Sequence, residues 1–186
     1  MLRKVIVSGL LGGAILIAWA FVVNGVFGFR SKIDMKPISN ERQVYETLKA
    51  YIVEPGRYIC NPELSSSGTF PREEPVFGIH YSGMGHEFAG RLMFFQLALF
   101  LLAPMIAAWM LSVASERMLA RYHLKVLFFA AIGLLVAVYG DLLKFGIDSY
   151  PLDDALMLAA YDIAAWTLVG LVVAWRMKPV PDTMTR

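Results

Sequence analysis

The sequence predicts a mainly α membrane protein with four transmembrane helices and a small α+β extracytoplasmic insertion between the first two. Hydrophobic residues make up 58% of the 186 residues, more than the ~45–50% that is usual in soluble domains. Four apolar runs each have the length that crosses ~30 Å of hydrocarbon as a helix. Helix is required because lipid cannot satisfy backbone polar groups. The predicted helices are residues 5–29, 92–114, 124–144 and 154–177, and residues 30–91 form the insertion.

The first apolar run has features of both a signal peptide and a membrane anchor. Arg3 and Lys4 precede it, and Ala18 and Ala20 fit a cleavage site with alanines two residues apart. The run nevertheless continues to Phe29, which is longer than the apolar region of a typical signal peptide. We therefore expect an uncleaved first transmembrane helix.

The insertion begins with a predicted amphipathic helix of about 13 residues. Ser39 or Asn40 is expected to cap it, since short polar side chains accept hydrogen bonds from the first turn. Apolar residues then recur every four positions, at Val44, Leu48 and Ile52. A Pro-Gly pair follows and is expected to end the helix.

Two short strands are predicted in the rest of the insertion, at residues 57–61 and 76–81. They are expected to pair antiparallel and to pack on the preceding helix. A segment of this size is near the lower limit for folding alone. We therefore expect it to lean on the transmembrane helices.

Small residues and one proline indicate how the transmembrane helices approach each other. Gly9 with Gly13, and Gly170 with Ala174, are four residues apart and allow close helix contact. Pro104 lies within the second run and is expected to kink that helix.

Basic residues predict the orientation of the chain, because Lys and Arg gather in cytoplasmic loops. The insertion is neutral, with eight basic and eight acidic residues, and the connection between the third and fourth helices is acidic. With four spans, three basic segments lie on one side, which predicts cytoplasmic termini. They contain Arg3 and Lys4, then Arg117, Arg121 and Lys125, then Arg176, Lys178 and Arg186.

Four polar residues are predicted to lie within or at the ends of the transmembrane helices: Asp162, Asn24, Asp141 and Lys144. Asp162 is the most unusual, since a carboxylate within a span costs roughly 2.5–3.5 kcal/mol on insertion scales. It could serve as a proton or cation relay, or as an anchor for a partner. The alternative is a structural pair with Lys144, Asn24 or a tyrosine hydroxyl. Asn24 itself is typical of a hydrogen bond between helices.

Three residues of the insertion are weak candidates for a metal site: His80, His86 and Cys60. Imidazole and thiolate ligands suit copper, and pairing of the strands could place Cys60 opposite His80. The spacing matches no tight ligand motif, and Gly90 stands where a zinc-protease motif starting at His86 requires histidine. No histidine lies in a predicted span, which excludes haem held there by two histidines. We expect no resident metal, no cofactor and no catalytic residues.

Two segments resemble a family of bacterial four-helix inner-membrane proteins that has a small periplasmic domain and no assigned function. The first is Pro55-Gly-Arg-Tyr-Ile-Cys-Asn-Pro62, and the second is Tyr161-Asp-Ile-Ala-Ala-Trp-Thr-Leu-Val-Gly-Leu-Val-Val-Ala174. The resemblance implies a multi-pass protein of the bacterial inner (plasma) membrane with a periplasmic insertion. It brings no catalytic residue to this chain. Asp141 and Lys144 depart from the more apolar pattern of that family.

Together these features favour a non-catalytic accessory subunit, or an assembly or structural component, of a larger membrane complex. The expected partners are the lipid bilayer and either other membrane-protein subunits or further copies of this chain. Nucleic acid is not expected, because the net charge is only +2 and the basic residues flank the spans. One alternative is a small transporter or channel-like oligomer that uses Asp162. Another is a periplasmic-side metal-handling factor.

Overall fold

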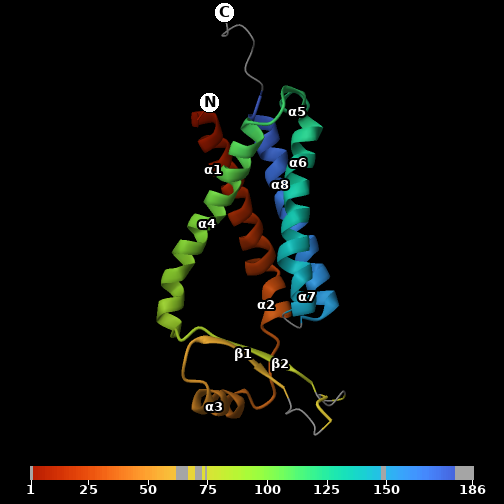
Figure 1. The fold of residues 1–186 in the computed structure, drawn as a ribbon. Coiled ribbons are helices and arrows are strands. Elements are labelled where there is room, and N and C mark those ends of the chain that lie inside the picture. The colour runs from red at the N-terminus through yellow and green to blue at the C-terminus, as the bar shows by residue number, and fades with distance from the viewer. Residues whose placement is uncertain (1, 62–66, 70–72, 74, 148–149, 179–186) are drawn as a thin grey trace, which may run out of the picture.

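The computed structural model, which describes residues 2–61, 67–69, 73, 75–147 and 150–178, is mostly helical (74%) with a small two-stranded sheet. Four of its helices are long and apolar enough to cross a membrane, which suggests a multi-pass membrane protein. These candidate spans are Leu2–Val26, Gly90–Ser112, Tyr122–Phe145 and Leu152–Arg176. Figure 1 shows the four helices side by side, with the sheet and a short helix at one end.

The first candidate span ends earlier than predicted. Helix α1 (Leu2–Ala20) continues as a π-helix, η1 (Phe21–Val26), and then stops. Gly28 has a φ of 61°, a left-handed conformation that glycine adopts without strain and that interrupts the helix. A short helix, α2 (Phe29–Asp34), follows.

The other candidate spans lie close to their predicted positions. They contain the long helix α4 (His86–Ser112), which remains helical through Pro104, and the antiparallel pair formed by α6 (Tyr122–Val136) and α8 (Leu152–Arg176). The shorter elements between these helices are α5 (Glu116–Ala120), π-helix η2 (Ala137–Leu142) and α7 (Leu143–Ile147).

The long helices form an open row in the order α4, α1, α8, α6, because α1 packs on both α4 and α8, and α8 packs on α6. We call the end next to the sheet the insertion end and the opposite end the far end. Figure 1 shows α4 leaving α1 as it approaches the insertion end. The start of α1 and the end of α8 both lie at the far end.

Glycines bring these helices close together. A Cβ at Gly13 would lie 2.9 Å from the Leu101 Cα of α4, and one at Gly9 would collide with Met105. Between α8 and α6, a Cβ at Gly170 would lie 2.7 Å from the Phe129 Cβ. These contacts confirm the close approach predicted from the glycine spacing.

The insertion contains a helix, α3 (Glu41–Tyr51), and strands β1 (Gly56–Cys60) and β2 (Phe77–Tyr81). The strands pair antiparallel, as predicted, with Tyr58 opposite Ile79. The predicted cap is only partly correct. Asn40 precedes α3 but has a left-handed φ of 58° and makes no capping hydrogen bond with its side chain. Its carbonyl oxygen instead accepts hydrogen bonds from the backbone of α3.

The helix and strands of the insertion pack less tightly than predicted. Helix α3 has no buried residue, and a pocket lies between this helix and β2. Among the described residues, neither α3 nor the sheet packs extensively on a long helix. One ion pair joins the connector after α2 to α8, with the Lys36 Nζ 2.7 Å from the Asp154 Oδ2.

Candidate functional site

Polar side chains gather near the insertion end, where two different helices change to π-helix. Asn24 lies in η1 and Asp141 in η2, so both π-helical segments carry one of the predicted polar residues. A π-helical turn contains an extra residue and is frequently found at functional sites. We take the surroundings of these two segments as the candidate functional site.

The first part of the site is a pair of carboxyl groups, Asp141 of η2 and Asp162 of α8. Asp141 is 2% exposed, and the carboxyl group of Asp162 lies near it. Helical side chains lean toward the N-terminus of their own helix. Because α6–η2 and α8 run antiparallel, these two side chains lean toward each other. We call these two residues the carboxyl pair.

Lys144 forms an ion pair with Asp141, and Arg30 and Lys144 are the cations near Asp162. The Lys144 Nζ lies 2.8 Å from the Asp141 Oδ1, three residues earlier in the chain. The second oxygen of Asp141, Oδ2, is buried and has no hydrogen-bond partner among the described residues. The lysine side chain is 27% exposed, so the cation lies between the carboxyl pair and the surface.

The second part of the site surrounds Tyr161, the residue before Asp162. The Asn24 Nδ2 donates a 3.1 Å hydrogen bond to the tyrosine hydroxyl. The Phe29 ring stacks at 5.4 Å, the Trp19 ring lies at 5.7 Å, and the Arg30 guanidinium lies 5.8 Å from the ring centroid. The Asn24 Oδ1 and the Trp19 Nε1 are buried without a hydrogen-bond partner. We call these five residues the tyrosine cluster.

All four predicted polar residues therefore lie near one another along α8, but their pairing differs from the expected one. Lys144 donates a hydrogen bond to Asp141, and Asn24 donates one to Tyr161. Asp162 makes none of the expected pairs in the part of the chain that the structure describes, and its carboxyl group lies near that of Asp141. Consecutive residues of a helix point in different directions. Tyr161 of α8 therefore faces α1 and η1, whereas Asp162 faces η2.

Lys125 was predicted only to help set the orientation of the chain, and Gln96 was not predicted to have a role. Lys125 is buried at the far end of α6 and donates a 2.6 Å hydrogen bond to the Met177 carbonyl oxygen. Gln96 of α4 is exposed, and no hydrogen bond is recorded for its side chain. A search for any amide or lysine inside an apolar run would have found both.

The metal candidates are not brought together in the part of the chain that the structure describes. His80 lies opposite Arg57, whereas Cys60 lies opposite Phe77, so the expected pairing of Cys60 with His80 is wrong. Side chains alternate between the faces of a strand, which places Cys60 and His80 on opposite faces. The His86 side chain lies outside the described residues, and no group of three ligating residues occurs among the described ones.

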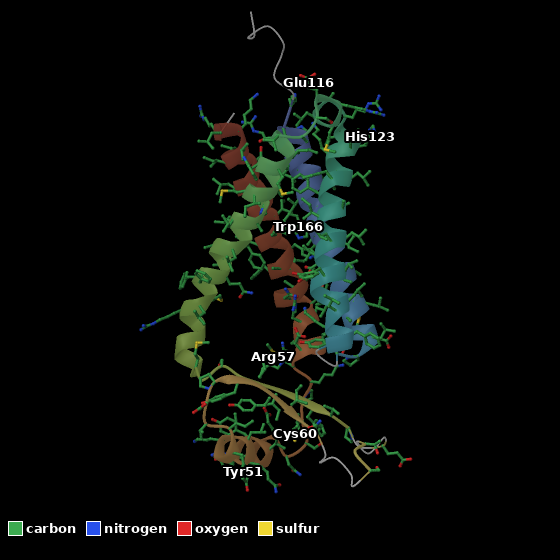
Figure 2. The ribbon with its side chains drawn as sticks, in the orientation of Figure 1. Tyr51, Arg57, Cys60, Glu116, His123 and Trp166 are labelled. Atoms are coloured by element: carbon green, nitrogen blue, oxygen red, sulfur yellow. The ribbon has the colours of Figure 1, made fainter. Side chains whose placement is uncertain are left out.

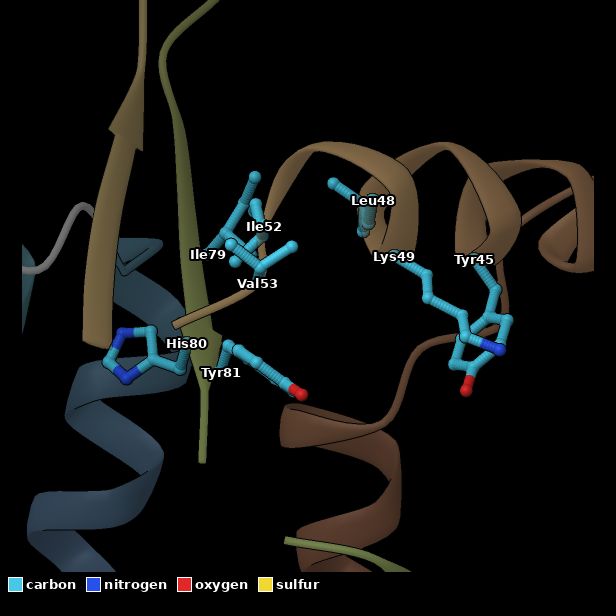
Figure 3. A pocket seen from close by; sticks show the side chains of 8 residues that line it. All are labelled: Tyr45, Leu48, Lys49, Ile52, Val53, Ile79, His80 and Tyr81. Carbon is cyan, nitrogen blue, oxygen red and sulfur yellow. The ribbon is translucent and has the colours of Figure 1, made fainter. Parts of the chain in front are cut away.

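An apolar pocket of about 360 Å³ separates α3 from β2. Figure 3 shows aliphatic side chains from both elements around it, with Lys49 and Tyr45 reaching toward it from α3. This pocket lies in the insertion, away from the carboxyl pair. Figure 2 shows Tyr51 and Cys60 of the insertion below the long helices and Trp166 among these helices.

No protein-family model, curated protein or solved structure matches this chain. The resemblance to bacterial four-helix inner-membrane proteins therefore depends on the two sequence segments alone.

Proposed function

We propose that this protein is a non-catalytic accessory or structural subunit of a larger membrane complex in the inner membrane of a bacterium. Both termini would be cytoplasmic and the insertion periplasmic, in line with the distribution of basic residues. The subunit would bind its partner within the membrane, through the half of α4 that lies near the insertion end.

The observation that carries this proposal is an unpaired amide on a helix half with few neighbours. Gln96 lies six residues beyond the start of its candidate span at Gly90, or ~9 Å at 1.5 Å per residue. It is exposed together with Phe94 and Phe95, which are 73% and 66% exposed. Lipid cannot satisfy an amide at this depth, whereas a helix of another subunit can.

The distribution of charge favours this role over transport through a single chain. A proton or ion path needs polar groups at successive depths. In the described parts of the candidate spans, the charged residues are the carboxyl pair or lie toward helix ends. Between the carboxyl pair and Lys125, the apolar core around Phe129 and Trp166 separates the two ends.

Photo-crosslinking in the native membrane tests the subunit role. A photoreactive residue replaces Gln96 in one variant and Leu135 in the control, because Leu135 is also exposed, on α6. We expect a stoichiometric protein adduct at position 96 and only lipid adducts at position 135. Mass spectrometry then identifies the adduct after purification in mild detergent.

The variant Gln96→Leu tests whether the amide of this residue binds the partner. It removes no hydrogen bond recorded within the chain, so the protein should fold as before. Loss of an interhelical hydrogen bond worth about 0.6–1.7 kcal/mol should weaken partner binding by roughly 3- to 15-fold. A monomer in native nanodiscs, with lipid adducts alone at position 96, would refute the proposal.

A further inference from the structure

Lys125 is a buried cation with no counter-ion among the described residues. It is 4% exposed, and its Nζ donates a 2.6 Å hydrogen bond to the Met177 carbonyl oxygen. A lysine ammonium group has three N–H donors, so two remain for another acceptor. The ion pairs recorded in the described ranges all join other residues. Because burial of an unpaired charge costs free energy, this ammonium group needs an anion that the described residues do not supply.

A second lysine lines the same space at the far end. A pocket of about 480 Å³ between α6 and α8 is lined by both Lys125 and Lys178, and Lys178 is exposed. Figure 1 shows these two helices side by side at this end. Ala120 and Ala174 also line the pocket, and their small side chains leave room for a ligand. Two like charges on one pocket repel each other, whereas an anion between them would attract both. The pocket therefore favours a negatively charged ligand.

The pocket lies at the depth where a membrane has its phosphate groups. Lys125 is three residues inside the candidate span that begins at Tyr122, or ~4.5 Å from its start. Lys178 lies two residues beyond the span that ends at Arg176. Tyr122 and Trp175 line the same pocket, and such rings gather at the interface between membrane and water. Phospholipid head groups are the anions that are abundant at this depth.

An apolar path leads from this pocket toward the middle of the helix row. Trp175, Leu171 and Leu168 are four and three residues apart, a spacing that places them on one face of α8. Leu171 is 42% exposed, and with Leu168 it lines a second pocket, of about 300 Å³, between α1 and α8. The distance along the helix from Trp175 to Leu168 is ~10 Å. A phosphate at the two lysines therefore has an apolar surface beside it, which fits the acyl chain of a lipid.

We propose that Lys125 and Lys178 bind the phosphate of an anionic phospholipid, with one of its acyl chains along the Leu171 face of α8. The ammonium groups would donate charge-assisted hydrogen bonds to the phosphate oxygens. Basic pockets between transmembrane helices bind lipid head groups in this way. The site is independent of the proposed subunit role, because it lies on α6 and α8 rather than on α4. Either proposal can therefore fail without the other.

Native mass spectrometry of the full-length protein, purified free of lipid in a neutral detergent, tests this site. Phosphatidylglycerol, which is anionic, is compared with phosphatidylcholine, which has no net charge. We expect a single phosphatidylglycerol to bind each chain roughly 30-fold more tightly than phosphatidylcholine, since each of the two lysines contributes a factor of about 5. An excess of inorganic phosphate should not displace the lipid, because phosphate has no acyl chain to occupy the face of α8.

Three variants locate the lipid. Lys178→Gln, at an exposed position, should fold normally and weaken binding of phosphatidylglycerol about 5-fold. Lys125→Met keeps a long side chain without its charge and should weaken binding about 10-fold or more, because charge-assisted hydrogen bonds are lost. The matched control Lys4→Gln removes the same charge from an exposed position of α1 that does not line the pocket, and should leave binding unchanged. If Lys125→Met does not fold, Lys178→Gln and Lys4→Gln decide the question.

Three outcomes would overturn the lipid site. The wild-type protein could bind both lipids equally, which would mean that the lysines do not select an anion. Lys4→Gln could weaken binding as much as Lys178→Gln does, which would show attraction by net charge rather than by this pocket. Inorganic phosphate could displace the lipid, which would show that the pocket binds a free phosphate and that α8 contributes no acyl-chain surface.

Discussion

The two ends of the helix row differ in how they are held together. At the far end, α1 and α4 meet across glycines, and the side chains of Ala108, Leu111 and Val173 are fully or almost fully buried. At the insertion end, α4 has left the row, both π-helical segments occur, and polar contacts such as Asn24–Tyr161 and Lys144–Asp141 add to the apolar ones. Close apolar packing at the far end therefore stabilises the fold, whereas the candidate functional site lies at the insertion end.

This difference is what a membrane environment favours. Lipid tails are as apolar as leucine, so close van der Waals contact rather than hydrophobic burial holds helices together. Glycine contacts provide it at the far end. Polar groups near the insertion end cost free energy in lipid unless they are paired, which makes them specific but sensitive to change.

The largest expected effect is at the far end. In Gly13→Leu the new side chain would meet the Leu101 Cα at 2.9 Å and the Phe100 carbonyl oxygen at 3.0 Å, so the α4 backbone would have to move. Overpacking of this kind should lower the free energy of unfolding by about 3 kcal/mol. Titration with a denaturing detergent in mixed micelles measures this free energy of unfolding.

Gly25→Leu is the matched control, at the insertion end of the same span. The nearest atom to a Cβ at Gly25 is the Phe21 Cδ2 at 3.6 Å, an ordinary contact. We expect a change within about 0.5 kcal/mol, as is usual at sites without close neighbours. Equal losses at Gly13 and Gly25 would mean that the two ends are packed alike.

The sequence predicted the far end better than the insertion end for a physical reason. Apolar runs and glycine spacing depend on local pattern, so the four long helices and the contacts at Gly9, Gly13 and Gly170 could be anticipated. The π-helical segments, the break at Gly28 and the position of Asp162 near Asp141 depend on which helices become neighbours. The open order α4, α1, α8, α6 has no signature in the sequence.

A smaller effect is expected from the hydrogen bond between Asn24 and Tyr161. Tyr161→Phe removes the hydroxyl that accepts from the Asn24 Nδ2 at 3.1 Å. A double-mutant cycle with Asn24→Ala should give a coupling free energy of about 0.6 kcal/mol, and at most ~1.7 kcal/mol.

Tyr122→Phe is the comparison at the far end, where the Tyr122 hydroxyl donates to the Leu171 carbonyl oxygen at 3.0 Å in an exposed position. We expect it to lower the free energy of unfolding less than Tyr161→Phe does, because solvent can replace an exposed hydrogen bond. The reverse order would show that polar contacts near the insertion end do not stabilise the helices.

The smallest expected effect concerns the ion pair that ties the insertion to the long helices. The Lys36 Nζ and the Asp154 Oδ2 are 2.7 Å apart, but the lysine side chain is 59% exposed, so water and salt screen the attraction. Lys36→Ala should lower the free energy of unfolding by at most ~1 kcal/mol. Asp154 remains in the first turn of α8, where the helix dipole still stabilises its charge.

The consequence of losing this pair should be clearer in the position of the insertion than in stability. Cys60, the single cysteine of the chain, is exposed on β1 and can carry a spin label, with a second label at Leu135→Cys on α6. We expect Lys36→Ala, or high salt, to broaden the distribution of distances between the labels. Arg42→Ala, which breaks the Arg42–Glu46 pair within α3, should leave it unchanged. Equal widths in all three proteins would mean that the ion pair does not help to position the insertion.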